Sequence, residues 1–297
     1  MHATTILIRM FTALAALPPD SWARGTGRFC GWLLCVVFKC RRQYVEETLR
    51  RCFPQKSDRE IDAVVKGIYR NFCTTVVEIL RILHAPPGSI GELVKVENME
   101  YALDAVKQGR GMLVMSGHIG NWELMGPACA NIGYEMHAVV KHQRNRQIDE
   151  ALDLARRRMG TKTLFAGDSY RECIRVLRRG GNIAMIIDQN MIRREAVFVE
   201  FFGRKAATTP GLAILAAQTK APILPVYMTR NSDGKHTLHI CPWLEPPPDR
   251  KLETIEQATR QYTRVLEDII RREPEHWAWF HRRWNTRPPE EDEREEE

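Results

Sequence analysis

Apolar and polar positions along this chain of 297 residues follow two alternating periods, which together predict its secondary structure. From residue 111 onwards, short apolar runs bounded by glycine or charged residues are typical of buried strands. Between them, apolar positions three and four residues apart predict amphipathic helices. The strands are expected at 112–116, 137–141, 183–187, 196–199, 223–228 and 237–241. The helices are expected at 122–132, 146–159, 169–179, 210–219 and 254–272.

This alternation of strands and helices predicts an α/β fold: one domain over residues 46–289, with a largely parallel sheet and helices on both faces. Before the first strand, Ser57-Asp58-Arg59-Glu60 is a capping-box signature and predicts a helix over 61–83. Reactive groups in such folds gather in the loops beyond the carboxyl ends of the strands. The catalytic and binding residues are therefore expected in those loops.

The N-terminal region is apolar but interrupted. The run 4–17 contains Arg9, and the run 30–38 is framed by basic residues. Each run is shorter than the roughly 20 apolar residues of a membrane-spanning helix. We expect residues 1–45 to form a membrane-associating segment whose helices lie in the interface with basic residues on the headgroups. Two alternatives stay open: the helices cap a soluble core, or the first run is a cleaved signal peptide with a weak apolar region.

Charge is distributed unevenly. The net charge is +7, but residues 290–297 alone carry −6, which leaves +13 for the rest. An acidic run at a terminus is expected to be disordered. The basic body favours an anionic partner, such as a membrane surface, an acidic protein or a phosphorylated substrate, and no nucleic-acid-binding motif accompanies it. The eight cysteines form no C-x-x-C pair, which favours a reducing compartment and argues against a zinc site.

The strongest candidate for chemistry is the segment Ser116-Gly117-His118-Ile119-Gly120-Asn121-Trp122-Glu123, which follows the strand 112–116. A neutral imidazole takes a proton from a hydroxyl, and a carboxylate orients the imidazole and stabilises its charged form. On one helix, positions five apart do not share a face. The pairing therefore needs His118 in the turn and Glu123 in the first helical turn. We predict that His118 is the base and Glu123 its orienting partner.

Polar side chains also follow the other predicted strands, and we expect them to line a substrate site with the histidine. In chain order they are Asn121, Lys141, Arg144, Asn145, Arg158, Asp188, Gln189, Arg204, Thr208 and Thr209. Trp122, Phe201 and Phe202 are expected to line an apolar cleft. The segment 274–288 is dense in Trp and Arg, which fits either core packing or a membrane interface.

Five motifs in order carry a resemblance to a known family: His118 with Glu123 five residues on, Asp188-Gln189, Phe201-Phe202-Gly203-Arg204, Thr208-Thr209-Pro210-Gly211, and His281-Arg282-Arg283-Trp284 followed by Thr286-Arg287-Pro288. Together they resemble the late acyltransferases of lipid A biosynthesis. The resemblance runs from the N-terminal apolar segments to Pro288.

The resemblance implies an enzyme on the cytoplasmic face of a bacterial inner membrane. It would move a fatty acyl group from acyl carrier protein to a hydroxyl of a lipid A precursor, without a metal or redox cofactor. It further implies that Arg144, Asn145 and Arg158 lie near the acceptor or the oxyanion, with Asp188 and Gln189 lining the site. The chain departs from many relatives in having Lys141 where they have Arg, and in lacking a clear membrane span.

Three alternatives remain open from the sequence. The same chemistry could serve a lysophospholipid, a glycolipid or an aminolipid acceptor. His118 could instead activate water, which would make the protein a hydrolase. The chain could also be a non-catalytic protein that binds the membrane surface.

Overall fold

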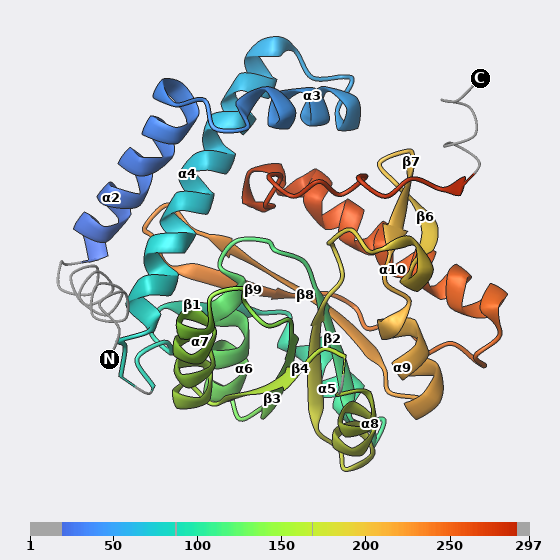
Figure 1. Cartoon of the computed structure of the whole chain (residues 1–297). Helices are drawn as coiled ribbons and strands as arrows, with labels where there is room; N and C mark the ends of the chain where they lie inside the picture. Colours follow the sequence, from blue (N-terminus) through green and yellow to red (C-terminus); the bar gives the residue numbers. More distant parts are fainter. Residues whose placement is uncertain (1–19, 87, 168, 290–297) are drawn as a thin grey trace.

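A seven-stranded sheet lies at the centre of the computed structural model, in the order β1-β9-β8-β2-β5-β3-β4 (Figure 1). The structure describes residues 20–86, 88–167 and 169–289. The strands are β1 (Val94–Glu97), β2 (Met112–Ser116), β3 (Met136–Val140), β4 (Thr161–Phe165), β5 (Asn182–Ile186), β8 (Ile223–Arg230) and β9 (His236–Ile240). Every neighbouring pair is parallel except β8 with β9. The predicted largely parallel sheet is confirmed.

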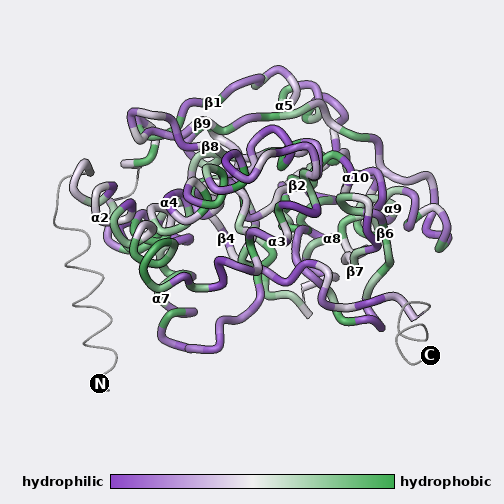
Figure 2. The backbone as a smooth tube through the Cα atoms, turned by 90° about the horizontal axis from the view of Figure 1, so that it is seen from above, coloured by the Kyte–Doolittle hydropathy of each residue, from purple (hydrophilic) through white to green (hydrophobic). Residues whose placement is uncertain are grey.

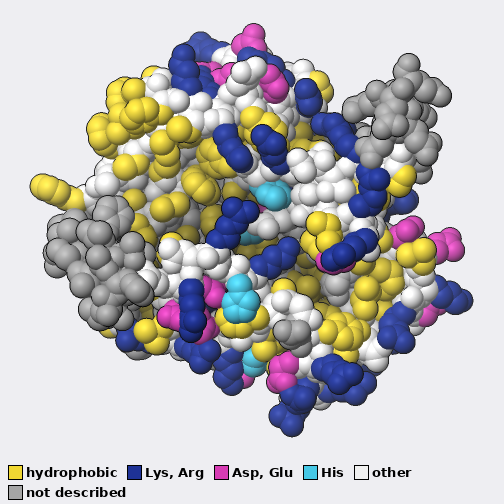
Figure 3. Space-filling model, viewed as in Figure 1, with side chains coloured by type: hydrophobic (Ala, Val, Ile, Leu, Met, Phe, Trp, Pro, Cys, Tyr) yellow, Lys and Arg dark blue, Asp and Glu magenta, His cyan; other side chains and the backbone are white. Residues whose placement is uncertain are grey.

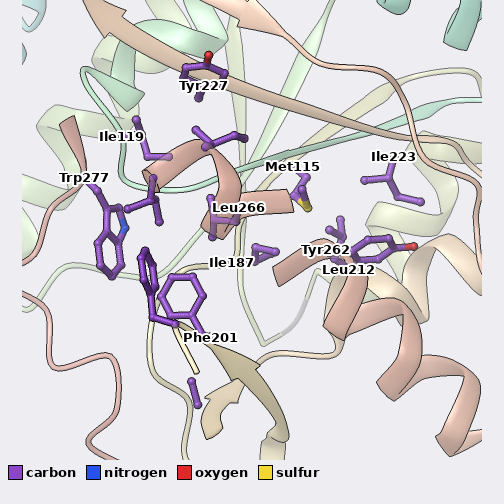
Figure 4. Close-up of a cluster of buried hydrophobic side chains, with 14 of the residues drawn as sticks. Met115, Ile119, Ile187, Phe201, Leu212, Ile223, Tyr227, Tyr262, Leu266 and Trp277 are labelled. Atoms are coloured by element: carbon purple, nitrogen blue, oxygen red, sulfur yellow. The ribbon is translucent and has the colours of Figure 1, made fainter. Parts of the chain in front are cut away.

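Helices cover both faces of this sheet, as predicted. The alternating residues of β2 show the two faces: Met112 and Val114 pack in one hydrophobic cluster, Leu113 and Met115 in the other. The first cluster includes residues of α5 (Met99–Val106) and α6 (Met125–Asn131), while α7 (Arg146–Arg158) packs against β4. The second includes residues of α8 (Tyr170–Arg178), α9 (Gly211–Thr219) and α10 (Leu252–Arg272) and is drawn in Figure 4. In Figure 2 the peripheral connections are largely hydrophilic.

The N-terminal part is helical. It contains α2 (Asp20–Trp32), a π-helical segment (Leu33–Val37), α3 (Arg42–Cys52) and α4 (Asp58–Ile82). The predicted capping box of Ser57 and Glu60 begins α4. Two glycines of α2 allow close packing on α4, since a Cβ at Gly27 would lie 2.5 Å from the Thr74 Cα. The apolar run 4–17 and the acidic run 290–297 fall outside the described residues. Among the described helices, none has both the length and the apolar character required to cross a membrane.

The structure differs from the predicted elements at several points. The edge strands β1 and β4 and the short α5 were not predicted, because their exposed positions break the apolar pattern. The expected strand 196–199 is one arm of a hairpin, β6 (Val197–Phe201) with β7 (Arg204–Thr208). The predicted helix 122–132 divides into a 3₁₀ turn, Trp122–Leu124, followed by α6.

The C-terminal segment decides between two earlier alternatives. After α10, a 3₁₀ turn (Pro274–His276) leads into an extended stretch across the core. Trp277, Trp279 and Trp284 are buried there, and Arg283 is 1% exposed. The tryptophans therefore belong to the protein core.

Candidate active site

His118 lies in the turn between β2 and the 3₁₀ turn that precedes α6. The turn depends on Gly120, which has a φ of +60°, and a Cβ there would lie 2.0 Å from the carbonyl oxygen of Met228. The backbone is fixed from the C-terminal segment, since the Ala278 N–H donates to the His118 carbonyl at 3.1 Å. Figure 4 shows Ile119 and Trp277 beside each other at this point.

Asp188, just beyond β5, holds the histidine. Its Oδ1 lies 2.8 Å from the His118 Nδ1, and its Oδ2 accepts the His118 backbone N–H at 2.8 Å. The indole Nε1 of Trp277 donates to the same Oδ2 at 2.7 Å. Asp188 is 3% exposed, so these donors replace water around the carboxylate. A carboxylate at Nδ1 selects the tautomer with its proton on Nδ1 and leaves Nε2 as the basic atom.

The contact between His118 and Asp188 shifts the pKa of both side chains. Burial alone would lower the pKa of His118, but the charge and hydrogen bond of Asp188, with the charge of Glu123, raise it above its usual value. Burial would raise the pKa of Asp188, but the charge and hydrogen bonds of His118 and the Trp277 indole lower it to about 2. Asp188 is therefore a fixed negative charge beside a histidine of raised basicity.

The Nε2 of His118 is on the open side of the site. The exposed Gln189 places its Nε2 3.3 Å from it, and the Trp122 ring lies edge-on to the imidazole at 5.0 Å between centroids. The side chain of His118 is 23% exposed. The site thus presents a partly exposed imidazole backed by a buried carboxylate.

Glu123 occupies a different position from the predicted one. Its two carboxylate oxygens accept from Arg156 of α7, at 2.9 Å from Nε and 2.7 Å from Nη2. The expected orienting contact between Glu123 and His118 is wrong for this structure, because Asp188 occupies Nδ1 and Arg156 occupies the Glu123 carboxylate. The charge of Glu123 still contributes to the raised pKa of His118. Glu123 therefore acts on the base at a distance and anchors α7 beside it.

A narrow apolar cavity adjoins the turn that carries His118, between the sheet and α6. Trp122, Glu123 and Arg156 line it together with side chains of β2, β3 and β5. It measures about 70 Å³ and is lined by three methionines, Met125, Met136 and Met185. Methionine side chains are flexible, so the cavity can widen around a longer apolar guest. The expectation that Phe201 and Phe202 line such a cleft is wrong, since both are buried in the opposite hydrophobic cluster.

Of the predicted substrate-contacting residues, the structure brings Asp188 and Gln189 to the histidine. Asn121 and Thr208 are both 0% exposed, which excludes contact with a substrate in this structure. Thr208 accepts from Arg283 and donates to the Ala206 carbonyl. Thr209 accepts the Gly211 N–H at the start of α9. Arg204 lies over the Trp284 ring.

The remaining predicted residues belong to the loop after β3 and to α7. Lys141 and Arg144 are exposed in the loop, and Asn145 caps α7 by accepting from the N–H groups of Gln147 and Ile148. Arg158 is exposed at the end of α7, whereas Arg156 faces the site. The apolar positions 152, 155 and 159, which are buried or half-buried, mark the inner face of that helix, and residue 156 adjoins this face. This spacing distinguishes Arg156 from Arg158.

A second, larger cavity lies apart from the histidine. It measures about 540 Å³ between α2, the end of α4 and the 233–236 turn, with Glu78, Leu124 and His236 in its wall. Within the described part of the chain, no three His, Cys, Asp or Glu side chains are arranged to hold a metal ion. All eight cysteine thiols are free.

The model of the bacterial lipid A biosynthesis acyltransferase family matches residues 2–286. The chain is 28% identical over 264 residues to the Escherichia coli K12 lipid A biosynthesis palmitoleoyltransferase, covering 88% of this chain and 84% of that protein. It is 27% identical over 262 residues to the lauroyltransferase of the same organism, covering 87% and 83%. With the myristoyltransferase it shares 26% identity over 292 residues, covering 95% and 86%.

Proposed function

The chain belongs to the bacterial lipid A biosynthesis acyltransferase family, and from this premise we propose that it transfers a fatty acyl group from an acyl carrier protein thioester to a hydroxyl of a lipid A precursor. Acyl transfer in lipid A biosynthesis follows from the family. The donor, the acceptor hydroxyl and the catalytic roles are the proposal. One observation carries it: the partly exposed His118 has Nδ1 bound to a buried carboxylate, and its neighbour Trp122 lines an apolar cavity.

In the proposed reaction, the Nε2 of His118 takes the proton of the acceptor hydroxyl as its oxygen attacks the thioester carbonyl carbon. The tetrahedral intermediate collapses, the C–S bond breaks, and the sulfur leaves with the proton that Nε2 returns. The fixed charge of Asp188 stabilises the imidazolium between these steps. Gln189 at 3.3 Å from Nε2 is placed to contact the incoming hydroxyl. No step needs a metal or a redox cofactor.

The acyl chain is proposed to enter the apolar cavity beside Trp122. Each methylene buried there would contribute about 0.8 kcal/mol. The Glu123–Arg156 pair lies at the cavity wall, where it would remain beside the thioester end of the chain. A long chain requires the methionine side chains to move, because the cavity is about 70 Å³ as it stands.

The carrier protein and the acceptor are proposed to meet the basic face of the molecule. Figure 3 shows Lys and Arg side chains around the centre of this face and hydrophobic side chains over α2 and α4. Lys141, Arg144 and Arg146 are exposed in and after the loop that follows β3. An acidic carrier protein and a phosphorylated glycolipid are both attracted to such a surface.

Membrane association is proposed to occur through α2. Trp22, Phe29 and Trp32 are 73%, 58% and 52% exposed and lie on the side of α2 opposite Gly27 and Gly31, which face α4. Phe38, 64% exposed, follows the π-helical segment. Exposed aromatics accompanied by the exposed Arg28 and Lys39 fit the interface of an anionic membrane, here the cytoplasmic face of the inner membrane.

The test compares lipid A from cells with the wild-type gene, without it, and with His118→Ala. Mass spectrometry should show one acyl group missing in the last two, and circular dichroism should show that the variant is folded. We expect His118→Ala to lose at least about 10²-fold in turnover with purified acyl carrier protein donors. Unchanged lipid A acylation would contradict the acceptor assignment, and free fatty acid as the main product would indicate hydrolysis.

A further inference from the structure

An ion pair between Glu78 and Arg230 contacts residues 117–121, which we call the catalytic turn because they include His118. The reaction proposed above makes no use of this ion pair. Glu78 of α4 accepts from Arg230 at the end of β8, with 2.9 Å from Nε to Oε1 and 2.7 Å from Nη2 to Oε2. The two side chains are 16% and 8% exposed. Desolvating such a pair is costly, and in some proteins a pair of this kind is retained because it fixes a geometry. The contacts of Glu78 point to that role here.

The first connection to the turn runs through Asn121. Its Nδ2 donates to the Oε2 of Glu78 at 2.9 Å, and the residue is fully buried. An asparagine before a helix ordinarily caps it, but Asn121 makes no capping bond. Its side chain points to α4 instead, and the chain continues as a 3₁₀ turn. The carboxylate of Glu78 thus fixes the end of the catalytic turn three residues from His118.

The second connection runs through the preceding glycine. The Thr75 hydroxyl donates to the Gly120 carbonyl at 3.2 Å, and Arg230 Nη2 donates to that hydroxyl oxygen at 2.9 Å. The Gly120 N–H donates to the His276 carbonyl at 2.9 Å. One guanidinium therefore orders both the carboxylate and the hydroxyl that bind consecutive residues of the turn.

The surroundings of Glu78 favour its charged form. Burial alone would raise the pKa of Glu78, but hydrogen bonds from His236 and Arg230 lower it to about 2. His236 Nε2 lies 3.3 Å from the Oε2 of Glu78. The acceptor that binds Asn121 is consequently a carboxylate at every pH at which the base could work.

We propose that Glu78, oriented by Arg230, is a positioning residue: through Asn121 and the Thr75–Gly120 contact it fixes the turn that directs His118 Nε2 toward the reacting hydroxyl. Its catalytic consequence rests on the proposed acyl transfer. Its structural part does not, because the orientation of the imidazole on Asp188 is observable without any substrate.

The experiment uses Glu78→Gln, Asn121→Ala and the double variant in the full chain in detergent micelles. Glu267→Gln is the matched control: Glu267 is also an arginine-paired carboxylate, 17% exposed, that accepts a backbone N–H, but it binds Arg271 and Phe202 instead of the turn. Unfolding in urea compares the stabilities. Steady-state kinetics with carrier-protein donor give kcat and KM, and nitrogen NMR of labelled histidine reports the His118 Nδ1 proton.

We expect Glu78→Gln and Asn121→Ala each to lower kcat about tenfold at unchanged KM, since small misplacements of a catalytic group are costly. The double variant should be no slower than the slower single variant, because the Asn121 contact is one of the two connections that Glu78→Gln already disturbs. The His118 Nδ1 proton signal should shift in these variants and stay in place in Glu267→Gln. If Glu78→Gln is too unstable to measure, Asn121→Ala alone decides, since it leaves the ion pair intact.

Two results would overturn the inference. One is that Glu78→Gln and Asn121→Ala match Glu267→Gln in kcat and in the Nδ1 signal, which would reduce Glu78 to a stabilising residue. The other is a raised KM at unchanged kcat, which would make Glu78 a ligand contact of the 540 Å³ cavity that it lines. Absence of acyl transfer by the wild-type protein would refute the proposed function alone, and the NMR comparison would still decide the positioning.

Discussion

At the scale of single residues, the choice of carboxylate beside His118 follows from strand register. Ser116 of β2 is paired with Ile186 of β5, so His118 and Asp188 each lie two residues past a matched pair. Adjacent parallel strands bring their carboxyl ends together, and this delivers Asp188 to Nδ1. The sequence displays Asp188 at the end of an apolar strand but not which strand is its neighbour. Local spacing therefore favoured Glu123 as the partner of His118. The contact with Asp188 spans 70 residues and could not be predicted from local spacing.

Replacing Asp188 by Asn tests the pair at this scale. Because the carboxylate raises the pKa of His118, the basic form prevails only above that raised value, and the acid limb of kcat/KM should lie above the usual histidine value of about 6.5. In Asp188→Asn the pKa falls, so the limb should move to lower pH. The plateau rate should fall about 10²-fold, because the imidazolium loses its counter-charge. An unshifted limb in a folded variant would contradict the assignment.

At the scale of elements, strands of the sheet centre were predictable and its edges were not. β2 and β5 are nearly or wholly apolar runs, and the predicted and observed bounds agree within one residue. β1 and β4 lie at the two edges, where exposed lysines interrupt the run. The 3₁₀ turn at Trp122–Leu124 was also not predictable, because the buried Glu78 removes the Asn121 side chain from its capping position. Local propensity fails where a tertiary partner competes for the same side chain.

The cavity between β5 and α6 leads to a prediction about chain length. Ala184 lines it two residues before Ile186, about 7 Å down the strand from the catalytic end. Ala184→Leu should fill this depth and exclude the end of a long acyl chain. Each excluded methylene costs about 0.8 kcal/mol, or about fourfold in kcat/KM. Competition between donors of different length should show selectivity moving to shorter chains, with the shortest donor little affected. Equal loss for every length would show that the chain lies elsewhere.

At the scale of the whole molecule, α2 has two sides with different partners. Gly27 and Gly31 let it lie close against α4, while Trp22, Phe29 and Trp32 face away from the protein. Phe29 and Trp32 stack on each other, with 6.1 Å between ring centroids, but all three aromatic residues are more than half exposed in the described fold. Their cost in exposed apolar surface is offset if they enter a membrane. The sequence predicted an amphipathic N-terminal segment, but only the packing of the glycines identifies which side is free.

Changing Trp22, Phe29 and Trp32 together to Ser should weaken binding of the full chain to vesicles of anionic and zwitterionic lipid. Losing about 1–2 kcal/mol of insertion per aromatic ring predicts at least about 100-fold weaker partitioning. The loss should persist at high salt, because screening removes only the contribution of the basic residues, about 1 kcal/mol each near an anionic surface. Leu252→Ser is the control, since Leu252 is 69% exposed on α10, away from α2. Co-sedimentation measures both. If the triple variant binds as the wild type does, α2 is not the membrane contact.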